Sequence, residues 1–222
     1  SRFALADRLF IGGLKNLLAG VTTVAHHNPL YREFGLHFPI RVVSRFGWAH
    51  SLGLEHGPSG AHGEPGGVVA ERYAATRDDR PFIVHAAEGT DEAAAREVDA
   101  LEASGCLRPN TVLVHGLAIS PARWHALFER GVSLVWCPVS NHFLFGRTLC
   151  MPCVLDSPAA RGRVALGSDS RVTGAVDLLD ELRAGAACRV DPSRLLDMVT
   201  ASGADVLRLD DAGRIRVGAP AD

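Results

Sequence analysis

Short and almost entirely apolar segments alternate along this chain with longer amphipathic segments, and no other feature constrains the fold as strongly. A brief apolar run rich in β-branched residues is typical of a strand that is buried on both faces of a parallel sheet. The segments between these runs are rich in Ala, Leu and Arg and have the periodicity of amphipathic helices. Strands that alternate with helices predict an α/β fold built on a parallel sheet.

The pattern predicts the position of each element. Strands are expected at 21–25, 40–45, 82–86, 111–115, 133–137 and 163–167, with one more around 46–51. Helices are expected at 4–19, 67–76, 91–104, 120–130, 175–187 and 193–201. A surface loop is expected at 55–67, and two short strands around an Asp-Ala-Gly turn are expected within 207–222.

Length and composition limit the class of protein. The chain has 222 residues, slightly fewer than the roughly 250 of a complete eight-stranded β/α barrel. Its 47% hydrophobic and 22% charged residues are those of a globular domain, and its net charge of -2 includes no basic block that would indicate nucleic-acid binding. No apolar stretch is long enough to span a membrane, and no secretory signal is visible, so we expect a cytoplasmic protein.

The five cysteines form no obvious disulfide framework, and we expect them to be reduced. Cys150-Met-Pro-Cys153 has the spacing of half a zinc site or of a redox motif. Because no second pair accompanies it, the sequence favours neither function there.

Polar residues stand at the carboxyl ends of the predicted strands. They are His26, His27 and Asn28 after the first strand, His85 and Glu88, His115, Ser140 and Asn141, and Asp169. The loops that follow the strands of a β/α fold converge on one edge, where ligands and catalytic groups gather. One histidine in such a place is most simply a structural residue. Several imidazoles and carboxyls together are costly to bury unless they are paired or bind a metal, so the set predicts a metal-assisted hydrolytic site.

Four of these segments, in this order and at this spacing, resemble the amidohydrolase superfamily, in particular its branch of cytosine, guanine and adenosylhomocysteine deaminases and triazine hydrolases. The matching segments are His85-Ala-Ala-Glu88, His115, Pro138-Val-Ser-Asn141 and Gly167-Ser-Asp169-Ser170. The beginning and end of the chain add weaker matches, Ala19-Gly-Val-Thr-Thr-Val24 to the family's second strand and 213–222 to the strand that re-enters its small β-sandwich. The resemblance implies a TIM-type (β/α)8 barrel, with residues 1–206 in the barrel and 207–222 at the start of the C-terminal half of the sandwich.

The resemblance also implies roles for individual residues. His85 and Asp169 would bind one divalent ion, Zn²⁺ or Fe²⁺, which lowers the pKa of a bound water. Asp169 would also accept a proton, Glu88 would act as general acid and base, and His115 would hydrogen-bond the hydroxide or the oxyanion. The alternative for Glu88 is a charge at the amino end of the following helix, which Thr90 or Asp91 would cap.

Trp48, His50 and Asn141 are the expected substrate-binding residues. Trp48 could equally lie in the core, and Asn141 with Ser140 could shape the turn after its strand. The expected reaction is the hydrolytic removal of an amino group from a nitrogen heterocycle, by a protein that could form homo-oligomers and needs no nucleic acid or membrane. The alternatives are hydrolysis of a cyclic amide or a halogenated ring, and an inactive barrel that serves as a binding or assembly scaffold.

The sequence departs from the family pattern at its start, in its middle and at its end. The family's first strand, which ends in His-x-His, is absent, and the adjacent pair His26-His27 cannot replace it because neighbouring residues of a strand face opposite sides. Between 45 and 80 only one strand is predicted where the family has two, and most of the sandwich is missing. We therefore expect these residues to be part of a longer protein.

Overall fold

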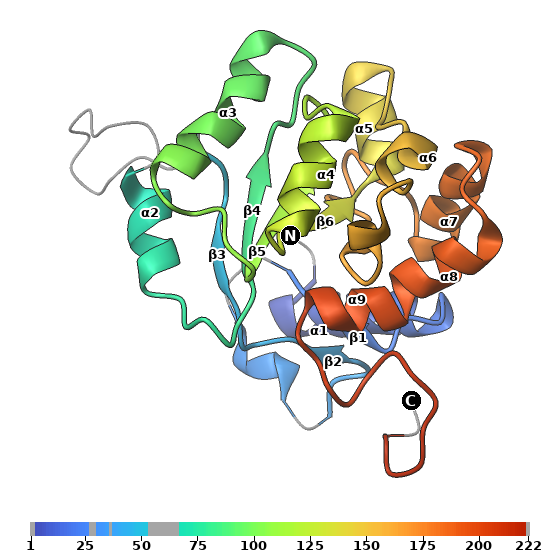
Figure 1. Ribbon diagram of the computed structural model, residues 1–222. Coiled ribbons are helices and arrows are strands. Elements are labelled where there is room, and N and C mark those ends of the chain that lie inside the picture. Colours follow the sequence, from blue (N-terminus) through green and yellow to red (C-terminus); the bar gives the residue numbers. More distant parts are fainter. Residues whose placement is uncertain (1–2, 27–29, 36, 53–66, 221–222) are drawn as a thin grey trace.

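The computed structural model describes residues 3–26, 30–35, 37–52 and 67–220, and it has the α/β architecture that the sequence predicts (Figure 1). Strands β3 (Gly47–Ala49), β4 (Phe82–Ala86), β5 (Thr111–His115), β6 (Ser133–Trp136) and β7 (Val164–Leu166) form a five-stranded sheet. The strands lie side by side in chain order, and all four pairings are parallel. Their carboxyl ends therefore meet at one edge.

Helices connect the strands; most of them border the main core on one face of this sheet, whereas Val206 of the last helix packs on the other face. These helices are α2 (Gly67–Ala74), α3 (Glu92–Ala103), α4 (Pro121–Glu129), α5 (Pro138–Phe145), α6 (Met151–Val154), α7 (Leu178–Ala187), α8 (Pro192–Val199) and α9 (Ala201–Val206). Local side chains fix where several of them begin. The Asp91 carboxylate accepts the Ala94 N–H at 2.9 Å and caps α3, and Ser120 caps α4 one residue before Pro121.

The two faces of the sheet have different neighbours. Phe82, Val84 and Ala86 of β4 are fully buried in the main core beneath the helices. Ile83 alternates with them and packs on the opposite face, against Val112 and the other apolar residues of β5–β7. Because side chains alternate along a strand, His85 lies on the same face as Ile83. This places the candidate site residue His85 at the carboxyl end of β4, on the face opposite the main core.

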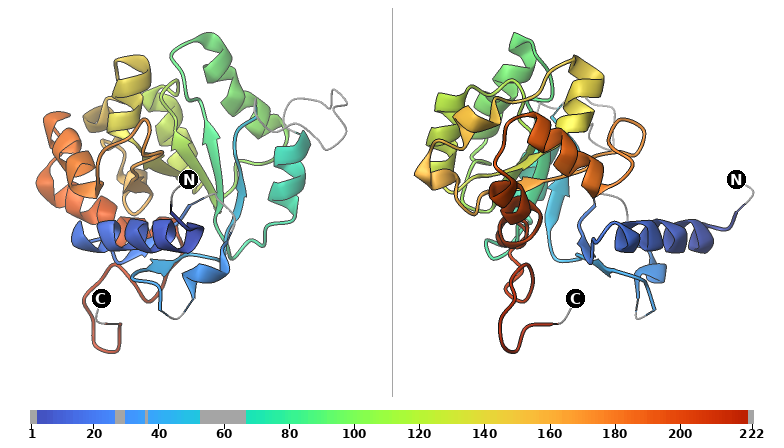
Figure 2. Two further views of the ribbon diagram at one scale, coloured as in Figure 1. Left: turned by 180° about the vertical axis from the view of Figure 1, so that it is seen from behind. Right: turned by 90° about the vertical axis from the view of Figure 1, so that its right-hand side faces the viewer.

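The first part of the chain forms a separate layer. Helix α1 (Leu5–Leu18) leads to the short strands β1 (Thr23–Val24) and β2 (Arg41–Val42), which pair in parallel, with the 3₁₀ turn η1 (Arg32–Phe34) between them. In the right-hand view of Figure 2 this unit projects to one side of the five-stranded sheet. Within the described residues, no helix is both long and apolar enough to cross a bilayer.

The predicted elements exist, with β4 and β5 at the predicted bounds, but three expectations were wrong. Residues 207–220 form turns and no strand, because Gly213 and Gly218 take left-handed φ angles that interrupt an extended run. Ser140 and Asn141 lie in helix α5 and not in a turn. Cys150 and Cys153 are joined in a disulfide, whereas Cys106, Cys137 and Cys188 are free. The predicted loop lies, apart from Gly67, outside the described residues, as do His27 and Asn28.

Candidate active site

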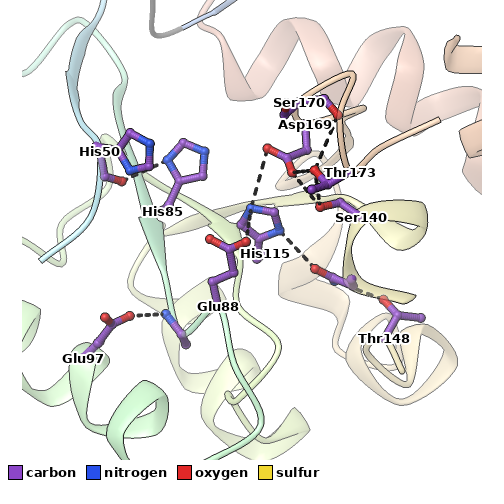
Figure 3. A network of polar contacts seen from close by, with 12 residues as sticks. His50, His85, Glu88, Glu97, His115, Ser140, Thr148, Asp169, Ser170 and Thr173 are labelled. Carbon is purple, nitrogen blue, oxygen red and sulfur yellow. Dashed lines mark hydrogen bonds and ion pairs between the residues drawn. The ribbon is translucent and has the colours of Figure 1, made fainter. Parts of the chain in front are cut away.

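Side chains from the ends of three strands meet at the carboxyl edge of the sheet (Figure 3). His85 is in β4, His115 ends β5, and Asp169 follows β7. One ligand atom from each of these three lies within 4.8 Å of those from the other two. Glu88, three residues beyond His85, reaches the same cluster, and its Oε1 lies 3.5 Å from His115 Nε2. The structure thus brings together all four residues that the sequence predicts for catalysis and metal binding.

The backbone of β3 orients the His85 ring. His85 Nδ1 lies 2.9 Å from the carbonyl oxygen of His50, and the two rings stack with centroids 5.0 Å apart. A carbonyl oxygen only accepts hydrogen bonds, so Nδ1 carries the proton and Nε2 keeps its lone pair. A metal-binding histidine is typically held in this way, by donating its other N–H to a carbonyl or carboxylate.

A chain of hydrogen bonds fixes the tautomer of His115. The Trp136 indole N–H donates to Thr148 Oγ1 at 2.8 Å, and the Asn141 amide Nδ2 donates to the same hydroxyl oxygen at 3.1 Å. Asn141 Oδ1 then accepts the proton of His115 Nδ1 at 3.0 Å. His115 Nε2 is therefore left as an acceptor, and within the described residues this buried atom makes no hydrogen bond.

Backbone conformation turns His115 toward the site. Strand alternation would point it, like Leu113, into the core beneath the helices. Its φ of 70° ends the extended run, and the fully buried side chain instead contacts Asn141 and Glu88. Ala87 (φ 52°) and Asp169 (φ 51°) share this left-handed conformation, which is strained for residues other than glycine. Three such residues at neighbouring strand ends indicate a site whose geometry the surrounding fold imposes.

Two hydroxyl groups hold the Asp169 carboxylate. Ser140 Oγ donates to Asp169 Oδ2 at 2.5 Å and Thr173 Oγ1 donates to the same oxygen at 2.9 Å. Burial is the largest single influence and raises the pKa of Asp169, but the Ser140 bond, the nearby His115 and the Thr173 bond together outweigh it and lower the pKa. Asp169 is therefore an ionised carboxylate with Oδ1 directed at His115, 4.0 Å from Nε2.

Glu88 is in a different electrostatic environment. Burial raises its pKa most, proximity to His115 lowers it, and the charge of Asp169 raises it further, so that the pKa lies above its ordinary value. Its side chain is still 30% exposed, against 13% for Asp169. Asp91 caps α3, as the alternative for Glu88 expected, while the Glu88 carboxylate lies 3.5 Å from His115 Nε2 in the cluster. Two carboxyl groups with opposite pKa shifts can divide the tasks of holding a charge and transferring a proton.

The donor set suits a divalent metal ion. His85 Nε2, His115 Nε2 and a carboxylate oxygen of Asp169 are the nitrogen and oxygen ligands that Zn²⁺ and Fe²⁺ accept. The lone pair of His115 Nε2 is buried without a hydrogen bond, which would be costly in a site that took no further ligand. These observations support a divalent metal and do not select between zinc and iron.

The three predicted substrate-binding residues have different positions. His50 lies at the edge of the site, stacked on His85, and Asn141 is buried behind His115, to which it is hydrogen-bonded. Trp48 lies two residues before His50, further from the carboxyl edge, and the guanidinium of Arg72 in α2 packs over its ring at 5.1 Å. The structure therefore brings His50 and Asn141 to the cluster and does not bring Trp48 there.

Two further glutamates, the half-buried Glu97 and the fully buried Glu181, support the site and are not among the residues that the sequence predicts. Glu97 of α3 accepts the Ala87 N–H at 2.8 Å and so holds the strained residue that precedes Glu88. Glu181 of α7, which is fully buried, accepts the N–H groups of Val139 in α5 and of Ala175 beyond Asp169. Each acidic residue stands beside apolar core residues on the inward face of its helix. An acidic residue on the inward face of a predicted amphipathic helix is therefore the sequence pattern that indicates Glu97 and Glu181.

Known proteins resemble this chain in sequence. The amidohydrolase family profile matches residues 68–222. The 5-methylthioadenosine/S-adenosylhomocysteine deaminase of Nitratidesulfovibrio vulgaris (strain DP4) is 28% identical over 92% of this chain and 50% of its own length. The 8-oxoguanine deaminase of Pseudomonas aeruginosa is 30% identical over 69% of this chain and 37% of its own length. The chain thus spans about half the length, or less, of these relatives.

A solved structure supports the same fold. The crystal structure of an adenosine deaminase from Xanthomonas campestris with bound zinc aligns with 98% of this chain and 60% of its own chain, with a TM-score of 0.68 and 20% sequence identity. At this identity the likeness shows the fold, which is that of the β/α barrel, here represented by part of its strands. Together with the family match over more than two thirds of the sequence, it establishes that the chain belongs to the amidohydrolase family.

Proposed function

We propose that this chain carries the greater part of the active site of a metal-dependent aminohydrolase that removes an amino group from a nitrogen heterocycle and releases ammonia. The convergence of His85, His115 and Asp169 beside the protonatable Glu88 is the observation that carries the proposal. The deaminases of adenine nucleosides and of 8-oxoguanine among the relatives support the substrate class.

In this proposal His85 and Asp169 hold the divalent ion. The ion, when bound, lowers the pKa of a coordinated water toward neutrality. Asp169 is suited to a ligand role because its hydroxyl partners keep it ionised while Oδ1 remains directed at the cluster. The sequence contains no His-x-His pair, so the proposal assigns only these two ligands, beside His115.

Glu88 is the proposed general acid and base. Burial raises its pKa, which favours the protonated form that a general acid needs, and its partial exposure leaves it accessible to a substrate. Glu88 would give this proton to a ring nitrogen as water adds to the adjacent carbon. It would then pass one proton of the added water to the departing amino group, which leaves as ammonia, and the second proton of the water would return to Glu88 as the product carbonyl forms.

His115 is proposed to act as an acceptor. Because Asn141 holds the proton on Nδ1, Nε2 of the neutral ring can bind the metal ion or accept a hydrogen bond from the attacking water. Donation to an oxyanion, the role expected from the sequence, would require the doubly protonated ring. Zinc or iron as the metal, binding of substrate by His50, Trp48 and Asn141, a cytoplasmic location and a homo-oligomeric state stay predictions.

A substrate panel tests the proposal. The purified protein is loaded with Zn²⁺ or Fe²⁺ and incubated with aminopurines, their nucleosides, aminopyrimidines, a chlorotriazine and a cyclic amide. The proposal predicts release of ammonia from at least one amino heterocycle. Chloride or a ring-opened product without ammonia would instead assign the site to the alternative hydrolase reactions. Absence of bound metal together with no turnover would identify an inactive barrel.

A further inference from the structure

The disulfide Cys150–Cys153 follows Thr148 closely in the sequence, but neither cysteine belongs to the active-site cluster. Both cysteines are exposed, whereas the free thiols of Cys106 and Cys137 are buried. Thiol–disulfide exchange requires direct access of a thiolate to the sulfur that it attacks. Among the described cysteines, this pair is therefore both bonded and open to an external thiol.

The residues around this disulfide are fixed in the core. Met151 and Val154 of α6 are fully buried, Leu149 is 7% exposed, and His125 of α4 donates from Nε2 to the Cys153 carbonyl oxygen at 2.9 Å. The bond thus closes a tight turn between two anchored points. On the amino side of Cys150 the chain passes through the buried Leu149 to the half-buried Thr148, and Gly146 and Arg147 before them are exposed.

That path contains Thr148, two residues before Cys150. Thr148 Oγ1 accepts hydrogen bonds from both Trp136 and Asn141, and Asn141 in turn holds the Nδ1 proton of His115. Three hydrogen-bonded residues therefore connect the backbone next to the disulfide with an imidazole of the active site (Figure 3).

We propose that Cys150 and Cys153 form a redox-modification site whose oxidation state sets the position of Thr148 and, through Asn141, the orientation of His115. The oxidised form is the one in which the hydrogen-bond chain is complete. The reductant is a thiol of the glutathione class. Two glutathione thiols react with the disulfide in two exchange steps, leaving two protein thiols and one glutathione disulfide, so two electrons and two protons pass to the protein.

The bond itself is tested by differential alkylation. Protein equilibrated with glutathione disulfide, and separately with reduced glutathione, is treated with iodoacetamide and the cysteine peptides are analysed by mass spectrometry. Cys150 and Cys153 should be protected in the first sample and alkylated in the second. Alkylation of both in the oxidised sample would show that the disulfide does not form and would overturn the proposal.

The connection to the active site is tested by NMR on the same two samples. The protein has three tryptophans, and the Trp136 indole N–H donates to Thr148, so its ¹H–¹⁵N signal reports on this link. The signal, assigned with a Trp136→Phe variant, should shift on reduction, while that of Trp48 on β3 should not. An unchanged Trp136 signal in fully reduced protein would disprove the link.

Catalysis provides a third readout that rests on the proposed function. We expect kcat to fall by about tenfold on reduction, since a misplaced catalytic group can cost this much or more. The Cys150→Ser/Cys153→Ser variant should have the lower kcat in either buffer, and Cys188→Ser should respond as the unchanged protein does. A kcat that is equal in both buffers contradicts the coupling. Failure of the deaminase assignment would leave the alkylation and NMR results standing.

Discussion

At the scale of single residues, the site depends on where protons lie as much as on which side chains are present. His85 and His115 each donate from Nδ1 to a fixed oxygen, that of the His50 carbonyl and that of the Asn141 amide. Both therefore present Nε2 to the region between them and Asp169. Their positions at strand ends could be predicted from the sequence, since polar residues there interrupt apolar runs. Their orientation could not, because it depends on partners 35 and 26 residues away in the chain.

The two carboxyl groups should respond differently to loss of charge. Glu88→Gln keeps the size of the side chain and leaves the metal donors in place, so bound metal should be unchanged while kcat falls by about 10²–10⁴-fold. Asp169→Asn removes a charged ligand, so both metal content and kcat should fall. Metal analysis and initial rates measure the two effects.

Glu92→Gln is the matched control for Glu88→Gln. Glu92 lies in the first turn of α3, pairs with Arg96, and its side chain is 84% exposed. This variant should retain both metal and rate. A Glu88→Gln protein with the unchanged rate would show that Glu88 is not the general acid and base.

At the scale of elements, buried acceptors join helices to the loops that carry the site. Glu181 receives N–H groups from α5 and from the segment after Asp169, and burial raises its pKa above the ordinary value despite these two bonds, which lower it. A folded-state pKa that is raised stabilises the protein most below the unfolded pKa, and this contribution is lost as the pH rises through the folded value.

Glu181→Gln should remove this pH dependence. The free energy of unfolding of the unchanged protein, minus that of the variant, should decrease as the pH rises from below the ordinary glutamate pKa to neutrality. Urea denaturation at several pH values measures the difference. Glu129→Gln, at an exposed position at the end of α4, should give a flat difference. A flat difference for Glu181→Gln would contradict the burial effect.

The turn after β5 depends on Gly116, which follows His115. Gly116 has a φ of 58°, and a Cβ there would lie 2.2 Å from Cζ2 of the buried Trp124. Gly105 has a similar φ of 71° but open space around it. Gly105→Ala should therefore cost about 1–2 kcal/mol of unfolding free energy from backbone strain alone.

Gly116→Ala should cost about 1–3 kcal/mol more, because the added methyl group is also overpacked. Chemical denaturation of both variants gives the two values. Equal losses at the two positions would show that the Trp124 contact is not tight.

The sequence predicts an element correctly where an apolar run ends at a turn. It fails where contacts between distant parts of the chain determine the structure. Strands β4 and β5 have unbroken apolar runs and were located at their true bounds. Helix α5 was missed because Pro138 and the polar Ser140-Asn141 pair are typical of a turn, although proline is well tolerated in a first helical turn. The Asp169 partners Ser140 and Thr173 lie on different elements, so no local pattern could join them.

At the scale of the molecule, parallel strands in chain order carry the candidate groups to one edge. Neighbouring strands in this sheet are connected through helices, so residues as distant in sequence as His85 and Asp169 come within 4.8 Å of each other. The chain aligns with 60% of the zinc-bound adenosine deaminase chain, so in that protein the matching elements are part of a larger structure. The sequence motifs predicted this edge because their order along the chain is the order of the strands.

An anomalous-scattering map of crystals of the metal-loaded protein, recorded at the zinc and iron absorption edges, would locate the ion. We expect one strong peak within coordination distance of His85 Nε2 and an Asp169 carboxylate oxygen, with His115 Nε2 beside it. Crystals of Asp169→Asn should lose that peak. A peak only at a surface position such as His125, or a peak at the strand edge that survives Asp169→Asn at full height, would contradict the assignment.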